Sequence, residues 1–173
     1  MQMEILKLST EWTKSELFSA KIVGLFSIIV LFSAIGFALW GKTVTAKAYV
    51  IPLIVSGLFL VAVGIGLYAA NKPRLELFQR EYNTNANSFV QKEIERTTKS
   101  QSDFKTVFKV LPLIIIIAAI LFMFLPSASA TWRAIAVTLI VTAAFLLIVD
   151  SNTSARNDSY REQLIKYTIS WKQ

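Results

Sequence analysis

The sequence predicts an all-α polytopic membrane protein, with four transmembrane helices arranged as two hairpins and accompanied by cytoplasmic amphipathic helices. Apolar residues make up 54% of the chain and charged residues only 17%, against about a quarter in ordinary soluble domains. Four long stretches carry no charge, and the polar stretches around them place apolar residues at helical spacing. We treat residues 1–173 as one membrane domain.

The four uncharged stretches have lengths typical of membrane spans. Ile22–Trp40 would extend about 28 Å as a helix at ~1.5 Å per residue, which matches a hydrocarbon core of about 30 Å. Residues 48–70 and 110–125 are further spans, and short links make 22–70 and 110–149 two antiparallel hairpins. The fourth stretch, 134–149, is shorter, so Arg133 must reach the interface beside Trp132 for it to span. The alternative is a re-entrant fourth segment.

The polar stretches 1–21, 71–109 and 150–173 are predicted to form amphipathic helices. Within 71–109, a turn at Asn83–Asn87 separates a short helix that begins near Pro73 from a longer one. Pro112 is expected to kink or break the longer helix before the third span. The helical spacing is carried by Ile5, Leu8 and Trp12, by Leu75, Phe78 and Tyr82, by Val90, Ile94, Thr97, Gln101, Phe104 and Phe108, and by Tyr160, Leu164, Tyr167 and Trp171.

The distribution of basic residues predicts the orientation. Every lysine and arginine except Lys42, Lys47 and Arg133 falls in the three polar stretches. The positive-inside rule then places these stretches and both termini in the cytoplasm, with the chain in the plasma (inner) membrane. We interpret the net charge of +7 as topological, so no nucleic-acid partner is expected.

The absence of certain residue types limits the cofactors and the reactions that the chain can support. The chain contains no cysteine and no histidine, so the usual ligands of zinc, haem and transition metals are absent, and we expect no cofactor and no metal. None of the four predicted spans contains Asp, Glu, Lys, Arg or His, the ionisable residues that coupled transporters and intramembrane catalysts need at depth. We therefore expect a non-enzymatic protein without catalytic residues.

Two sets of residues in the spans are candidates for contacts. Small residues in the second span allow close helix approach: Gly57, Ala62, Gly64, Gly66 and Ala70. We favour packing against small residues of the first span, such as Ala20 and Gly24, over a subunit interface. Thr131, Thr138 and Thr142 share one face of the fourth span, where they form either a polar path or, as we favour, ordinary helix contacts.

The aromatic and apolar faces of the inner helices are the candidate partner surface. They combine Phe78, Tyr82, Ile94, Phe104, Tyr160 and Tyr167 with basic neighbours. Such a composition suits a lipid interface or a protein partner.

These features favour a small membrane protein that acts by binding, such as an accessory, defence or toxin-immunity subunit. Its expected partners are the lipid bilayer and a protein partner or a second copy of itself. The alternative is a homo-oligomeric pore lined by the threonine face. A third alternative, a lipid-modifying enzyme, would use Asp150, Arg156 and Glu81 at the inner interface.

The order of the segments also indicates an internal duplication. The pairs that would support it are Glu11-Trp12 with Asp103-Phe104, and Arg74 and Phe78 with Arg156 and Tyr160.

Overall fold

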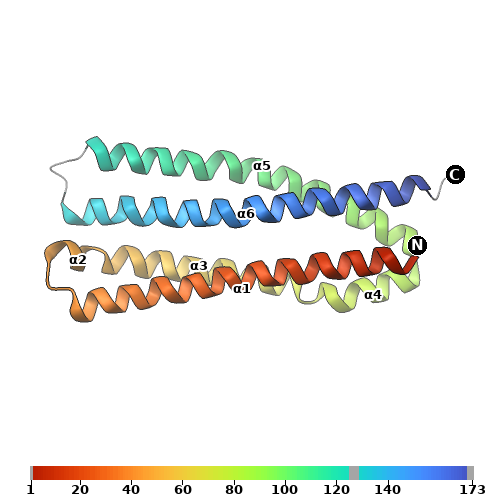
Figure 1. The fold of residues 1–173 in the computed structure, drawn as a ribbon, viewed down its shortest axis with the longest axis horizontal. Coiled ribbons are helices and arrows are strands. Elements are labelled where there is room, and N and C mark those ends of the chain that lie inside the picture. The colour runs from red at the N-terminus through yellow and green to blue at the C-terminus, as the bar shows by residue number, and fades with distance from the viewer. Residues whose placement is uncertain (1, 125–128, 171–173) are drawn as a thin grey trace.

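The computed structural model describes residues 2–124 and 129–170, and within these ranges the chain is helical, without strands. The helices are α1 (Gln2–Trp40), α2 (Val44–Ala48), α3 (Val50–Asn71), α4 (Arg74–Thr84), α5 (Ala86–Phe124) and α6 (Ala130–Ser170) (Figure 1). The predicted positions Leu125 and Trp171 lie outside the described residues.

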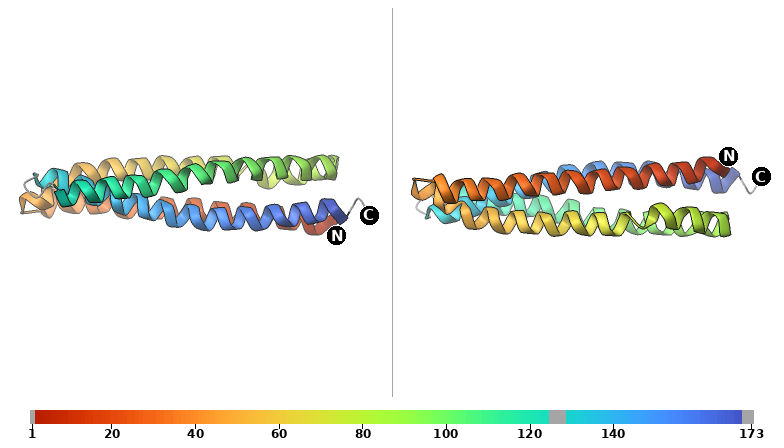
Figure 2. Two further views of the ribbon diagram at one scale, coloured as in Figure 1. Left: turned by 90° about the horizontal axis from the view of Figure 1, so that it is seen from above. Right: turned by 90° about the horizontal axis from the view of Figure 1, so that it is seen from below.

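The molecule is an elongated rod. α1 runs along the rod to the end that carries α2, and α3 and α4 run back in the opposite direction (Figure 1). α5 and α6 repeat this path (Figure 1). α1 packs along α3, and α5 packs along α6. Seen from above and below, α1 and α6 form one layer and α3, α4 and α5 form the other (Figure 2). Both termini therefore lie at the same end of the rod.

Apart from α4, the polar stretches do not form helices separate from the spans. Residues 1–21 were expected to form a helix distinct from the first span, but α1 runs on without interruption to Trp40, and α6 likewise crosses the boundary at residue 150. Of the two outcomes expected at Pro112, a kink or a break, the break is wrong, because Pro112 lies inside the continuous helix α5. Proline removes one backbone hydrogen bond, whereas ending a helix leaves several backbone groups unpaired, which is costlier in an apolar setting.

The predicted turn around residues 83–87 is present in a tighter form. α4 ends at Thr84 and α5 begins at Ala86, so that Asn85 alone connects them. The Asn85 side chain accepts a hydrogen bond of 3.0 Å from the backbone N–H of Ser88. This bond satisfies one of the free donors at the start of α5.

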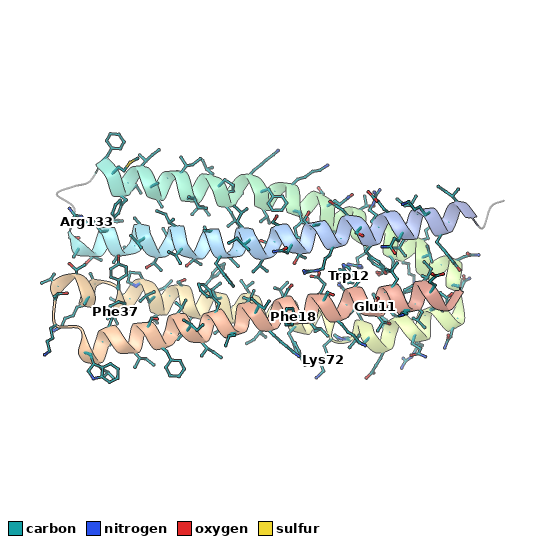
Figure 3. All side chains as sticks on the ribbon, viewed as in Figure 1. Glu11, Trp12, Phe18, Phe37, Lys72 and Arg133 are labelled. Carbon is teal, nitrogen blue, oxygen red and sulfur yellow. The ribbon has the colours of Figure 1, made fainter. Side chains whose placement is uncertain are left out.

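The rod has two halves of different surface. In the apolar half (residues 22–70, 110–124 and 130–149), large apolar side chains such as Phe32, Ile51, Ile117 and Val141 are exposed. Four helices, each including part of this half, are long and apolar enough to cross a membrane among the described residues. The terminal half (residues 2–21, α4, 86–109 and 150–170) instead has a core of its own; Figure 3 labels Trp12 in it and Phe37 in the apolar half.

The two halves of the sequence repeat one architecture. α1 and α5 are each 39 residues long. Aligned end to end, they set Ser9 opposite Glu93 and Thr13 opposite Thr97. Thr13 and Thr97 are both fully buried, and each hydroxyl donates to the carbonyl one turn earlier, at 2.9 and 2.8 Å. The internal duplication and its predicted register stay a prediction.

The returning helices show the same correspondence. α6 contains 41 residues, as does the helical segment Val44–Thr84. When α6 is aligned with Val44–Thr84 from their first residues, Ser56 corresponds to Thr142 and Asn71 corresponds to Asn157. Both asparagines are buried, and the hydroxyls of Ser56 and Thr142 lie 2.6 Å apart. Equivalent positions therefore lie at the same depth in the rod.

Candidate functional site

One face of α3 packs against α1 through glycine. A Cβ atom added at Gly57 would lie 2.5 Å from Leu31 Cδ2, and one added at Gly64 would lie 3.3 Å from the backbone nitrogen of Gly24. Both glycines are buried, so the two helices approach closely at these positions. The predicted close packing with the first span thus involves Gly57 and Gly64.

The small-residue stripe of α3, which we define as Ala62, Gly66 and Ala70, lies on another face. All three residues are exposed, and a Cβ atom added at Gly66 would meet nothing within 4 Å. The expectation that this run packs against α1 is wrong. Residues 62 and 64 differ by about 200° around a helix, so the two sets cannot share one contact.

The three predicted threonines lie together in one groove. The groove has a volume of about 540 Å³ and lies between α3, α5 and α6. Thr131, Thr138 and Thr142 line it from α6, and Ser56 lines it from α3. The hydroxyls of Ser56 and Thr142 contact each other at 2.6 Å, which is the helix-to-helix contact that we favoured for a membrane threonine.

Thr138 differs from Thr142 in having no hydrogen-bond partner. Its residue is only 7% exposed, and its Oγ1 atom is buried and unpaired in the described structure. A hydroxyl in a membrane helix ordinarily donates to the carbonyl one turn back. Leaving it unpaired in an apolar setting costs about 1–3 kcal/mol. Thr138 thus carries an unsatisfied hydroxyl in a residue that borders the groove.

The groove is larger than the cavity on the opposite side of the Ser56–Thr142 contact. That second cavity, between α1, α3 and α6, measures about 230 Å³ and also touches Thr138. Phe37 and Tyr49 line it, with ring centroids 5.7 Å apart. On the groove side, α5 nowhere approaches α3 within a Cα–Cα distance of 8 Å in the described chain.

The predicted partner surface is mostly the inside of the terminal half. Phe78, Tyr160 and Tyr167 are 3%, 2% and 7% exposed and belong to one core cluster. Tyr82 and Ile94 pack against that cluster, and Phe104 is half-buried and stacks with Phe108. The apolar spacing that we assigned to a partner is satisfied by helices of the same chain, so this assignment is corrected.

A polar network that sequence reasoning missed crosses this core. The Tyr160 hydroxyl lies 2.7 Å from Ser9 Oγ and donates to Glu93 Oε2 at 3.0 Å. Arg96 binds both carboxylate oxygens of Glu93, at 2.9 and 2.8 Å, and its guanidinium lies 4.1 Å from the Trp12 ring centroid. Burial and the nearby carboxylate of Glu93 raise the pKa of Tyr160, so that its hydroxyl stays protonated.

Tyr82 belongs to the edge of the same core. Burial raises the pKa of Tyr82 to about 12, and a hydrogen bond with Tyr167 contributes in the same direction. The two tyrosines therefore connect α4 to α6.

A second network connects α1 to α6 nearer the apolar half. Arg156 donates to Glu16 Oε1 at 3.1 Å, to Ser19 Oγ at 2.7 Å and to Thr153 Oγ1 at 3.0 Å. Burial raises the pKa of Glu16, while Arg156 opposes that shift. Arg156 is thus a structural residue, and it does not form a site with Glu81, which pairs instead with Lys92 at 3.1 Å.

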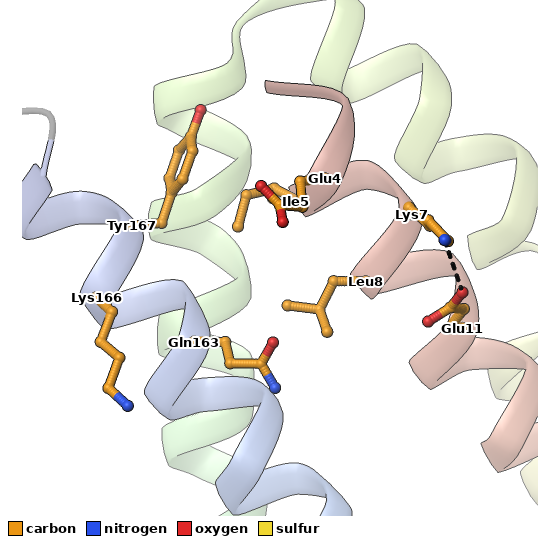
Figure 4. Close-up of a pocket in the computed structure, with 8 residues that line it drawn as sticks. All are labelled: Glu4, Ile5, Lys7, Leu8, Glu11, Gln163, Lys166 and Tyr167. Atoms are coloured by element: carbon orange, nitrogen blue, oxygen red, sulfur yellow. Dashed lines mark ion pairs between the residues drawn. The ribbon is translucent and has the colours of Figure 1, made fainter. Parts of the chain in front are cut away.

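A shallow cleft of about 450 Å³ lies between α1 and α6 near the termini (Figure 4). Lys7 and Glu11 on one side of it are 3.9 Å apart, and Gln163, Lys166 and Tyr167 line the other side. Its charged groups are of both signs and exposed, as on an ordinary solvated helix surface.

Comparison with protein-family models, with curated proteins and with solved structures finds no match for this chain. The class is defined by the fold, which is all-helical with four helices capable of crossing a membrane. In residues 2–124 and 129–170, no group of three or more carboxylate residues is placed to hold a metal ion.

Proposed function

We propose that this protein is a non-enzymatic accessory subunit of the inner membrane that acts by binding another membrane helix. In this proposal the chain crosses the membrane four times as two hairpins, with both termini in the cytoplasm. The terminal half then forms a cytoplasmic helical bundle, which agrees with the concentration of lysine and arginine there.

This proposal rests on the observation that the small residues of α3 lie on two different faces, one buried and one exposed. Gly57 and Gly64 are used in the contact with α1, whereas the stripe Ala62, Gly66 and Ala70 is exposed on the apolar half. Small residues four apart let a second helix approach closely, and membrane helices associate through such packing. The stripe therefore has the form of a helix-binding face that no part of the described chain covers.

The threonine-lined pore receives less support from this arrangement. Thr138 is buried within the chain, and the Thr142 hydroxyl is bonded to Ser56.

The test is to block the stripe without changing the fold. Gly66→Leu adds a bulky side chain where a Cβ atom meets nothing within 4 Å, so the chain itself should fold normally. Gly36→Leu is the matched control, because a Cβ atom at Gly36, on α1, also meets nothing within 4 Å. The mass of the complex extracted in mild detergent, together with cross-linking in the native membrane, gives the readout.

We expect the wild-type protein and Gly36→Leu to occur in a complex larger than the 19.4 kDa chain, and Gly66→Leu to be monomeric. A complex whose mass is a multiple of 19.4 kDa identifies the partner as a second copy, and any other mass identifies a different protein. A wild-type chain that is monomeric in both measurements overturns the proposal.

A further inference from the structure

We propose that the groove between α3, α5 and α6 binds one anionic glycerophospholipid, with its phosphate at Lys47 and an ester carbonyl at the Thr138 hydroxyl. The acyl chain would continue along the apolar wall past Leu139 towards Leu146. None of the three residues of the small-residue stripe lines the groove, although the stripe continues the face of α3 that carries Val55 and Phe59.

The groove has the dimensions and lining of a site for an elongated apolar ligand. From Thr131 to Leu146, α6 rises about 22 Å at ~1.5 Å per residue, which exceeds half of a hydrocarbon core of about 30 Å. Its volume of about 540 Å³ lies within the usual range for ligand sites. Most of its wall is aliphatic, and Val55, Ile114 and Leu139 contribute from three different helices.

The spacing of these helices does not by itself produce a groove of this size, because the cavity on the other side of the Ser56–Thr142 contact is smaller. On the other side of the Ser56–Thr142 contact, the smaller cavity is lined by the stacked rings of Phe37 and Tyr49. In the repeat alignment, Ile135 takes the place of Tyr49 on the groove side. A smaller aliphatic side chain thus leaves room where the other repeat has an aromatic ring.

Two polar features specify an amphipathic and anionic occupant. Thr138 lines the groove and its buried hydroxyl has no partner in the described structure, so an ester carbonyl seated against this residue would supply the missing acceptor. Lys47 lines the groove at its α2 end and is the one charged residue among the described residues that line it. Lys47 makes no ion pair with another described residue. A lipid with a phosphate above an ester carbonyl matches this order of groups.

The test measures lipid retained by the purified full-length protein. Protein is equilibrated with vesicles of equal parts phosphatidylglycerol and phosphatidylcholine, extracted, washed with detergent and weighed by native mass spectrometry. The wild-type chain should retain one phosphatidylglycerol. Thr138→Val, which removes the donor at nearly constant shape, should weaken retention about fivefold to tenfold, as expected for one lost hydrogen bond.

Three further variants separate this site from general lipid contact. Ile135→Phe fills the groove and should abolish retention, with helical content checked by circular dichroism. Lys47→Gln should remove the preference for phosphatidylglycerol, reducing its retention about fivefold. Lys42→Gln is the matched control, because Lys42 lies in the same connection but does not line the groove, and it should behave as the wild type.

Equal retention of the two lipids by the wild-type chain overturns the proposal. So does unchanged retention in Ile135→Phe and Thr138→Val, because the lipid would then be bound only at the outer surface. Equal losses in Lys47→Gln and Lys42→Gln also overturn it, since they would reflect surface charge alone.

Discussion

The hydroxyls of Ser56 and Thr142 lie 2.6 Å apart, and the two residues correspond when α6 is aligned with the helical segment Val44–Thr84 from their first residues. They meet where α3 contacts α6 in the apolar half, with one cavity on each side of them. This contact joins the first helix pair to the second at a place where little else is polar.

The first prediction concerns the strength of this contact. Ser56→Ala and Thr142→Val should each destabilise the protein by about 0.5–1.5 kcal/mol, and the double variant should cost less than their sum by about 0.6 kcal/mol. A double-mutant cycle on unfolding in detergent micelles measures the coupling. Strictly additive losses would contradict a hydrogen bond between the two side chains.

The second prediction concerns the Tyr160 hydroxyl in the terminal half. Tyr160→Phe keeps the ring that stacks on Trp12 but removes the donor to Glu93. We expect a loss of about 1–3 kcal/mol in the free energy of unfolding, because a buried carboxylate loses one of its donors. Thermal unfolding followed by circular dichroism gives the measurement. Tyr68→Phe is the control, since Tyr68 is exposed, and equal losses in the two variants would contradict a specific role for Tyr160.

The third prediction concerns pH and Glu16. Burial raises the pKa of Glu16 above its ordinary value of 4.5 in the folded state, so the folded chain holds this proton more tightly than the unfolded chain does. Its contribution to stability is therefore complete below about pH 4.5 and is lost as the pH rises through the folded-state pKa.

Glu16→Gln removes this titration while Arg156 keeps its bonds to Ser19 and Thr153. Relative to the variant, the wild-type protein should be less stable at about pH 8 than at about pH 4. Chemical unfolding of both proteins at the two pH values gives the comparison. If the difference in unfolding free energy between the wild type and Glu16→Gln is the same at both pH values, or shifts in favour of the wild type as the pH rises, the predicted direction of the pKa shift is wrong.

The fourth prediction distinguishes the two faces of α3. Gly57→Ala should destabilise the chain by about 1–3 kcal/mol, because the added methyl group meets the side chain of Leu31 in a close-packed contact. Gly66→Ala should be neutral or stabilise it by up to about 1 kcal/mol, since alanine is the better helix former and the space is open. Unfolding of both variants in micelles is the measurement, and the reverse order would contradict the assignment of the faces.

The sequence by itself determined the fold class. Four uncharged stretches with the length of a bilayer predict the four apolar helices, because a backbone in an apolar medium must satisfy its own hydrogen bonds. The periodicity also predicted helices in the polar stretches and a turn near Asn85. It did not predict that α1, α5 and α6 continue through both environments, since the boundary of a span marks a change of surroundings and not the end of a helix.

Only the tertiary structure decided what each face contacts. An apolar face such as that of Phe78 and Tyr160 has the same spacing whether a partner or another helix of the same chain covers it. For the same reason, the sequence could not separate Gly57 and Gly64 from Ala62 and Gly66 by the neighbours that they contact. The groove at Thr138 arises from the distance between α3 and α5, and such a distance between helices is set by packing across the whole rod and not by any local pattern.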